Sequence, residues 1–200
     1  MNESSTDERL VEEAVEALQA GRPVVLPTDT VYGLCTSPDA AHSLAELKGR
    51  GRDQPIALLA ADVDTLLGLV PELPERMLRA LLPGSLTLIL PNPSRRYAVL
   101  TGSRPDTIGV RVPVLKGLAG QIVRRVGAVA ATSANLHGGS DPRRLHDVPE
   151  AIRKAALAVD GGELPGVPST VVDLTGPEPR VLREGAVPAI EVLGRLEQQG

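Results

Sequence analysis

Three small polar residues, Thr28, Asp29 and Thr30, follow Pro27 at the end of the apolar run 24–26, whose two valines are typical of a buried strand. In α/β proteins, ligands meet fixed polar groups where strands end. The same residue types also form turns in which hydroxyl and carboxylate oxygens cap their own backbone. The local sequence leaves both interpretations open.

Cations follow the next apolar segment, where Lys48, Arg50 and Arg52 alternate with glycines at the end of a predicted helix. Glycines would let the backbone and the guanidinium groups approach phosphate oxygens closely. A solvated helix C-terminus, whose cations complement the helix dipole, predicts the same residue types. Taken alone, this segment favours the solvated turn.

Two more polar groups adjoin breaks in apolar runs, namely Ser133 with Asn135 and Ser169 with Arg183. A single charge, Arg111, lies within a predicted strand, so we expect it to face a cavity or a partner. Together with the two earlier groups, these residues are typical of a site for an anion with many oxygens. Hydroxyl and guanidinium groups would bind that anion without a P-loop.

Several familiar sites are absent from the sequence. There is no Walker-type loop, dinucleotide fingerprint or Gly-x-Ser-x-Gly elbow. The three histidines lack zinc-ligand spacing, and we expect them at the surface. Aspartates near predicted strand ends could help to hold Mg²⁺, although the sequence favours none of them: Asp29, Asp53, Asp141, Asp160 and Asp173.

The composition of the 200 residues, 42% hydrophobic and 23% charged, predicts one globular domain. With no Phe or Trp and a net charge of −4, a protein that stacks single-stranded bases or coats nucleic acid is disfavoured. The lone cysteine, Cys35, excludes a disulfide framework and predicts a small buried residue in a reducing compartment. The acidic N-terminus and the short apolar runs predict a soluble, cytoplasmic protein without membrane contact.

Helix and strand patterns alternate along the chain, which predicts an α/β fold with a mixed sheet. We expect residues 1–5 to be frayed and residues 91–106 to form an irregular, basic and mobile loop. The expected strands are 24–26, 31–35, 56–60, 86–90, 107–112, 128–132, 158–160, 169–174 and 180–183. The expected helices begin at 6 and 37 and span 62–70, 74–82, 117–126, 149–157 and 188–198.

Several motifs in order closely resemble the YrdC-like family, the threonylcarbamoyl-AMP synthases. The resemblance covers about residues 8 to 195. The motifs are Pro27-Thr-Asp-Thr-Val-Tyr-Gly-Leu34, Lys48-x-Arg50, Pro83-Gly-Ser-Leu-Thr87, Val110-Arg-Val-Pro113, Ser133-Ala-Asn135, Pro168-Ser-Thr-Val-Val-Asp173 and Leu182-Arg-x-Gly-Ala186.

The resemblance implies a single YrdC-like domain over residues 1–200, with a twisted mixed sheet and flanking helices around a large basic cavity. It implies condensation of L-threonine, bicarbonate and ATP to threonylcarbamoyl-AMP and pyrophosphate. That is adenylyl transfer, which would make the enzyme a nucleotidyltransferase. The product supplies the N6-threonylcarbamoyladenosine of tRNA next to the anticodon, through partner proteins that carry out the transfer. Mg²⁺ would accompany ATP.

The resemblance also assigns residues. Thr30, Arg111 and Ser169 would bind L-threonine, and Lys48 and Arg50 would be catalytic as well as ATP-binding. The remaining ATP ligands would be Thr107, Ser133, Asn135 and Arg183. The chain departs from the family pattern at Gln54, at Leu59, where some members have histidine, and at Asp141, where serine is usual.

Two other functions remain as alternatives. A YrdC-like module could bind nucleotide or structured RNA without synthase activity, although the acidic charge and the scarcity of aromatics weigh against RNA. The module of hydrogenase-maturing carbamoyltransferases also makes a carbamoyl adenylate, but the acylphosphatase and zinc-finger parts of those chains have no counterpart in this sequence. Threonine-dependent release of pyrophosphate distinguishes the synthase from both.

Overall fold

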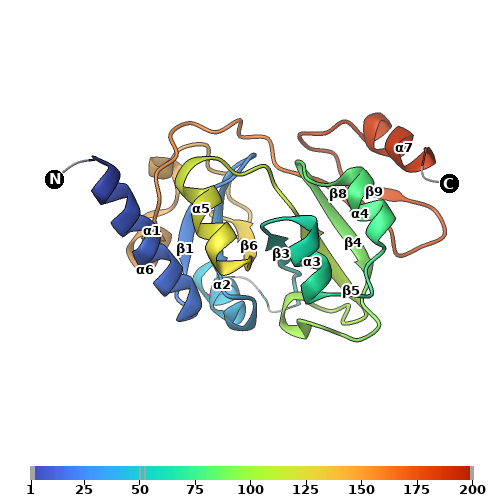
Figure 1. Ribbon diagram of the computed structural model, residues 1–200, viewed down its shortest axis with the longest axis horizontal. Helices are drawn as coiled ribbons and strands as arrows, with labels where there is room; N and C mark the ends of the chain where they lie inside the picture. The colour runs from blue at the N-terminus through green and yellow to red at the C-terminus, as the bar shows by residue number, and fades with distance from the viewer. Residues whose placement is uncertain (1–2, 50, 52, 199–200) are drawn as a thin grey trace.

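The structure is a computed structural model that describes residues 3–49, 51 and 53–198. Within these residues, nine strands form one twisted sheet in the order β7-β1-β2-β6-β3-β5-β4-β8-β9, flanked by helices (Figure 1). The strands are β1 (Val24–Pro27), β2 (Tyr32–Thr36), β3 (Ala57–Ala60), β4 (Leu86–Pro91), β5 (Thr107–Arg111), β6 (Ala128–Ser133), β7 (Leu157–Ala158), β8 (Thr170–Asp173) and β9 (Arg180–Arg183).

One helix precedes the first strand, one follows the last strand, and the others lie between strands along the chain. The helices are α1 (Glu3–Gln19), α2 (His42–Leu47), α3 (Val63–Leu69), α4 (Glu75–Leu81), α5 (Gly117–Val126), α6 (Glu150–Ala155) and α7 (Ala189–Glu197). Local sequence explains several of their ends. The Asp62 carboxylate accepts a hydrogen bond from the Thr65 amide at 2.6 Å and so caps α3. Gly127, with φ of 80°, ends α5.

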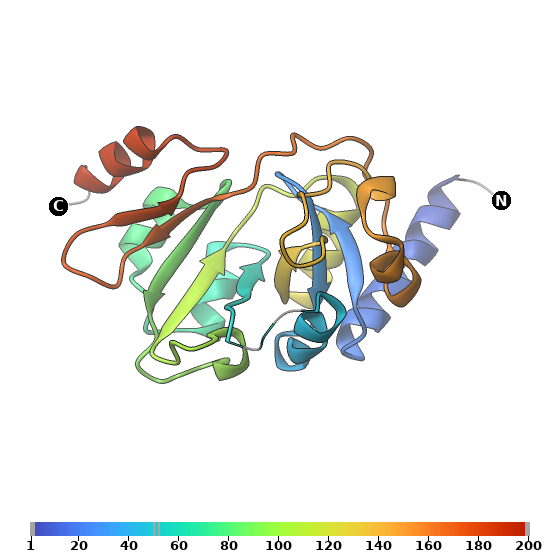
Figure 2. The same ribbon diagram turned by 180° about the vertical axis from the view of Figure 1, so that it is seen from behind.

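The sheet is mixed, as predicted. Strands β1, β2, β6 and β3 are successively antiparallel, whereas β3 pairs with β5, and β4 with β8, in parallel. The predicted return between β8 and β9 is an antiparallel pair. The segment that follows β7 runs along the top of the molecule in Figures 1 and 2 to β8 and so connects its two halves.

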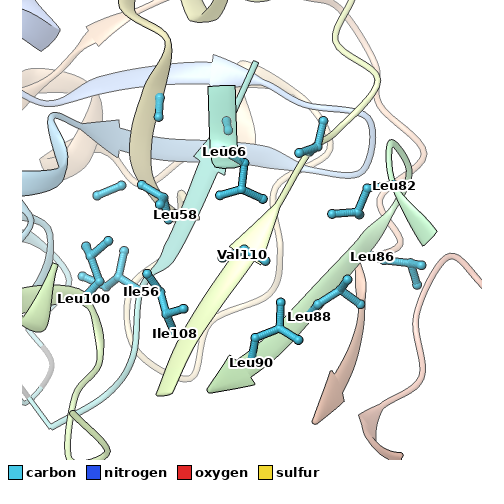
Figure 3. Packing of buried hydrophobic residues seen from close by; sticks show 14 of the residues in the cluster. Ile56, Leu58, Leu66, Leu82, Leu86, Leu88, Leu90, Leu100, Ile108 and Val110 are labelled. Atoms are coloured by element: carbon cyan, nitrogen blue, oxygen red, sulfur yellow. The ribbon is translucent and has the colours of Figure 1, made fainter. Parts of the chain in front are cut away.

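Alternation along three neighbouring strands separates the core from a cavity. Even-numbered residues of β4, β5 and β8, such as Leu88, Val110 and Val172, belong to the larger core cluster, together with buried residues of α3, α4 and α7 (Figure 3). Odd-numbered residues of the same strands, such as Thr87 and Arg111, line the cavity. Because successive side chains point to opposite faces, the strand register places polar residues opposite the core.

A second core cluster lies at the other half of the sheet. Buried residues of α1 and α5, such as Val11, Leu18 and Ile122, pack there with Val129 of β6 and with Cys35, as predicted for that cysteine. Both clusters consist almost wholly of aliphatic side chains, which follows from the near absence of aromatic residues.

Some predicted boundaries are wrong. Residues 3–5 are helical rather than frayed, because no Pro or Gly interrupts the segment and α1 extends to Glu3. The helix expected to open at Ser37 begins as a 3₁₀ turn, Pro38–Ala40, before α2. The loop 91–106 contains a further 3₁₀ turn, Ala98–Leu100, and its mobility stays a prediction. Throughout the described segments, no helix has both the length and the apolar character needed to cross a bilayer.

Candidate active site

A cavity of about 400 Å³ opens on the odd-numbered face of β3, β5, β4 and β8. Its wall includes six of the predicted site residues: Thr30, Thr107, Arg111, Ser133, Ser169 and Arg183. Three arginines, Arg104, Arg111 and Arg183, and one carboxylate, Asp141, line it within the described residues. The expected basic cavity is therefore present, and sequence-distant strands bring its residues together.

Arg111, at the end of β5, is held by the turn after β1. Its Nη2 forms an ion pair with the Asp29 carboxylate and donates a second hydrogen bond to the Thr30 hydroxyl at 2.9 Å. The side chains of Arg111 and Asp29 are only 11% and 9% exposed. Burial lowers the pKa of Arg111, and the Asp29 charge opposes that shift. The single charge predicted to face a cavity does so.

Thr28 shows that both interpretations of the first polar turn are correct. Its hydroxyl donates to the Val31 carbonyl at 2.7 Å and accepts from the backbone amides of Thr30 and Val31. This is the self-capping turn. The neighbouring Asp29 and Thr30 side chains face Arg111 instead. One short segment therefore provides both the turn and part of the binding site.

Ser169 and Arg183 also meet at the cavity wall. The Arg183 guanidinium donates to the Ser169 carbonyl from Nη2 at 2.8 Å and from Nε at 3.2 Å, and the Ser169 hydroxyl lies 2.8 Å from that of Thr87. Gly185 makes this approach possible, because a Cβ there would lie 2.1 Å from the Pro168 carbonyl oxygen. Close packing therefore explains why the Leu182–Ala186 motif has a glycine at position 185.

Lys48, at the end of α2, is buried rather than solvated. Its Nζ donates to the Ser133 carbonyl at 2.5 Å and to Asn135 Oδ1 at 2.6 Å. The Ser133 hydroxyl donates to the same Oδ1 at 2.7 Å. The expectation of a solvated turn is thus wrong for Lys48, which lies directly behind the cavity-lining Ser133. Arg50 and Arg52 lie outside the described residues.

Arg104 and Thr107 line the cavity near the end of the loop 91–106. The Thr107 hydroxyl donates to the Arg104 carbonyl at 3.0 Å. Arg104 Nη1 lies 3.1 Å from the Asp173 carboxylate, and Nη2 bonds the Thr175 hydroxyl at 3.0 Å. Burial raises the pKa of Asp173, but hydrogen bonds from Thr175 and Arg104 outweigh it, so the pKa is lowered.

The donor set for a metal ion is limited. Within the described residues, no group of three His, Cys, Asp or Glu side chains could hold one. Asp141 lines the cavity, and its carboxylate lies 3.4 Å from the amide nitrogen of Asn135. Mg²⁺ commonly binds through one or two carboxylates together with substrate phosphates, and these residues fit that mode. The three histidines are exposed, as predicted.

Comparison with known proteins identifies the family. A family model named Sua5/YciO/YrdC, with the description "telomere recombination", matches residues 16–185. The chain belongs to this family. The recognised motifs, spread along almost the whole chain, therefore reflect membership of the Sua5/YciO/YrdC family.

Relatives of this family cover the chain to different extents. A Mycobacterium tuberculosis protein, provisionally named threonylcarbamoyl-AMP synthase, is 38% identical over 90% of this chain and 88% of its own length. The threonylcarbamoyl-AMP synthases of Pyrococcus abyssi and Bacillus subtilis are 37% and 33% identical. These matches cover 88% and 93% of this chain but only 54% and 56% of the relatives.

Solved structures agree with the sequence relatives. The crystal structure of P. abyssi Sua5 complexed with L-threonine matches with a TM-score of 0.85 and 34% identity, over 95% of this chain and 58% of that one. Escherichia coli YciO matches with a TM-score of 0.75 and 29% identity, over 92% of both chains. Full-length HypF, at 18% identity, shares the fold alone.

Three contributors to the site were not assigned by the sequence reasoning. Asp29 was considered as a polar residue at a strand end and as a metal ligand, but not as the partner of Arg111. Arg104 was considered only as part of a basic loop, and Thr87 only as part of a motif. Asp29 and Thr87 stand within recognised motifs, which is the signal that could have found them. Arg104 had no such signal, because its partner Asp173 lies far along the chain.

Proposed function

We propose that this chain is an L-threonylcarbamoyladenylate synthase that condenses L-threonine, bicarbonate and ATP to threonylcarbamoyl-AMP and pyrophosphate. The observation that carries this proposal is the convergence of Thr30, Arg111, Ser133, Ser169 and Arg183 on one cavity in a member of the Sua5/YciO/YrdC family. The class of enzyme is a nucleotidyltransferase. Its product would serve the N6-threonylcarbamoyladenosine modification of tRNA, with partner proteins completing the transfer.

L-threonine would bind at the wall formed by Thr30, Arg111 and Ser169. A guanidinium beside hydroxyl groups suits an amino acid, because the cation pairs with the carboxylate and the hydroxyl oxygens accept from the amine. The relative complexed with L-threonine supports this choice of substrate. The buried Asp29 holds the guanidinium in place.

ATP would bind along the remaining walls. Lys48, Ser133 and Asn135 form one hydrogen-bonded group. Arg183 provides a guanidinium group elsewhere on the cavity wall. Arg50, by its place in the Lys-x-Arg motif, would join them at the phosphates. Cations near transferring phosphoryl groups stabilise the charge that develops in the transition state, so Lys48 and Arg50 are the proposed catalytic residues. Thr107 would complete the ATP ligands.

The reaction needs no covalent enzyme intermediate. The unprotonated threonine amine adds to the carbon of CO2 with release of a proton, or displaces water from bicarbonate, and either reaction gives the carbamate. A carbamate oxygen then attacks the α-phosphorus of ATP, the bond to the bridging oxygen breaks, and pyrophosphate leaves. The protein contributes positioning and charge stabilisation, which explains why no nucleophile stands out in the cavity.

Mg²⁺ would enter with ATP, and Asp141 is the cavity-lining carboxylate that could help to hold it. When bound, the ion supplies neutralisation of phosphate charge. We also propose a cytoplasmic location, since the buried thiol of Cys35 suits a reducing compartment.

Pyrophosphate release tests the proposal. The purified chain, incubated with ATP, Mg²⁺ and bicarbonate, should release pyrophosphate only when L-threonine is added, and mass spectrometry should detect threonylcarbamoyl-AMP. Omitting bicarbonate should abolish release, because the carbamate cannot form. Binding of ATP without threonine-dependent release would contradict the synthase and favour the nucleotide-binding module.

A further inference from the structure

The hydrogen-bond donors of Arg111 divide into a set held by the protein and a set left for a ligand. A guanidinium has five N–H groups, two of them on Nη2. Both Nη2 hydrogens are used, one by Asp29 and one by Thr30. Within the described residues, the buried Nε has no partner. The bonds to Asp29 and Thr30 therefore fix one edge of the group and leave Nη1 to meet a ligand in the cavity.

The hydroxyl protons of the same cluster can also be placed. The single proton of Thr28 goes to the Val31 carbonyl at 2.7 Å, which can only accept. In the 3.0 Å contact between the hydroxyls of Thr28 and Thr30, Thr30 is then the donor, and the two lone pairs of Thr28 are shared between that proton and the longer contacts from the amides of Thr30 and Val31, at 3.2 and 3.3 Å. Thr30 in turn accepts from Arg111. Its remaining lone pair can only accept a hydrogen bond from a ligand.

Asp29 is itself held from behind. The Ser85 hydroxyl donates to Asp29 Oδ2 at 2.7 Å, while Oδ1 pairs with Arg111. Because both partners of the ion pair are almost fully buried, water cannot replace the carboxylate. The cluster thus presents a fixed polarity to the cavity, with cationic donors on Arg111 beside an acceptor on Thr30.

From this cluster we infer that Asp29 and Thr28 are positioning residues that set the polarity of the Arg111–Thr30 pair for the carboxylate and the amine of an α-amino acid. The inference rests on the proposed function, because it concerns the L-threonine wall of that site. Asp29 bonds Nη2 and so orients Nη1, which meets the carboxylate. Thr28 takes the Thr30 proton and so keeps that hydroxyl an acceptor for the ammonium or the unprotonated amine.

The test measures binding of two ligands by calorimetry without ATP. One is L-threonine, and the other is L-threoninamide, in which a neutral amide replaces the carboxylate. The wild-type chain should prefer threonine by about 10- to 100-fold, the range of a charge-assisted contact. Asp29→Asn should reduce that preference about tenfold, because the guanidinium is no longer oriented, while ATP affinity changes less than about twofold.

A purely structural role for Asp29 would weaken both amino-acid ligands equally, so the ratio of their affinities separates the two roles. Thr28→Val should weaken both ligands about tenfold without changing the ratio, since each carries the amine. Asp62→Asn is the matched control, because asparagine caps a helix as well as aspartate and Asp62 lies outside the cavity wall.

Two results would overturn the inference while leaving the synthase intact. One is a folded Asp29→Asn protein with an unchanged ratio, and the other is a Thr28→Val protein with wild-type affinities. If Asp29→Asn does not fold, Ser85→Ala decides, because it loosens the carboxylate without leaving a buried charge and should lower the ratio about threefold. Failure of the wild-type chain to bind threonine would instead contradict the proposed function itself.

Discussion

Two arginines on the cavity wall are each paired with an aspartate, yet their surroundings differ. The side chains of Arg111 and Asp29 are 11% and 9% exposed, whereas that of Arg104 is 50% exposed beside an Asp173 that is 9% exposed. A buried pair depends on its partner to stay charged, while a half-exposed arginine can be solvated by water. The first pair is therefore expected to fix geometry, and the second to allow movement.

Stability should show the largest difference between the two pairs. Asp29→Asn leaves Arg111 charged and buried, so the free energy of unfolding should fall by about 3 kcal/mol. Asp173→Asn leaves a solvated arginine and should cost at most about 1 kcal/mol. Urea denaturation measures the free energy of unfolding of both variants. An equal decrease in the two variants would show that burial does not make the Arg111–Asp29 pair more important for stability than the Arg104–Asp173 pair.

Substitution of the arginines should give the next largest effect. Arg111→Lys loses the planar guanidinium group, which can donate hydrogen bonds to Asp29, Thr30 and the ligand at the same time. The kcat/KM for threonine should therefore fall about 100-fold. Arg104→Lys keeps a charge at a half-exposed position and should lower it only about threefold. Steady-state pyrophosphate release checks both values. A larger loss for Arg104→Lys would reverse the comparison.

The smallest effect concerns pH and belongs to the second pair. Hydrogen bonds from Thr175 and Arg104 outweigh burial and lower the pKa of Asp173 below its unfolded value. Its stabilising contribution is therefore complete above about pH 4, the usual pKa of aspartate, and is lost as the pH falls through the folded pKa. Unfolding between about pH 5 and 2 should be less pH-dependent in Asp173→Asn. An unchanged pH dependence in that variant would contradict the assignment.

The sequence determined the elements and the candidate residues. Aliphatic runs between Gly and Pro predicted nearly every strand, because strand burial and chain-breaking residues are local properties. The single charge in β5 was enough to predict that Arg111 faces a cavity. Motif resemblance predicted the family and collected residues that proved to line one site.

Only the tertiary structure decided which residues touch. Lys48 looked like a solvated helix end, but α2 places its amine against Ser133 and Asn135, which lie far along the chain. The register of β4, β5 and β8 decided that their odd-numbered residues face the cavity, and a shift by one residue would have reversed both faces. The partner of Arg111 was equally hidden, because an ion pair between distant segments leaves no local pattern in a sequence.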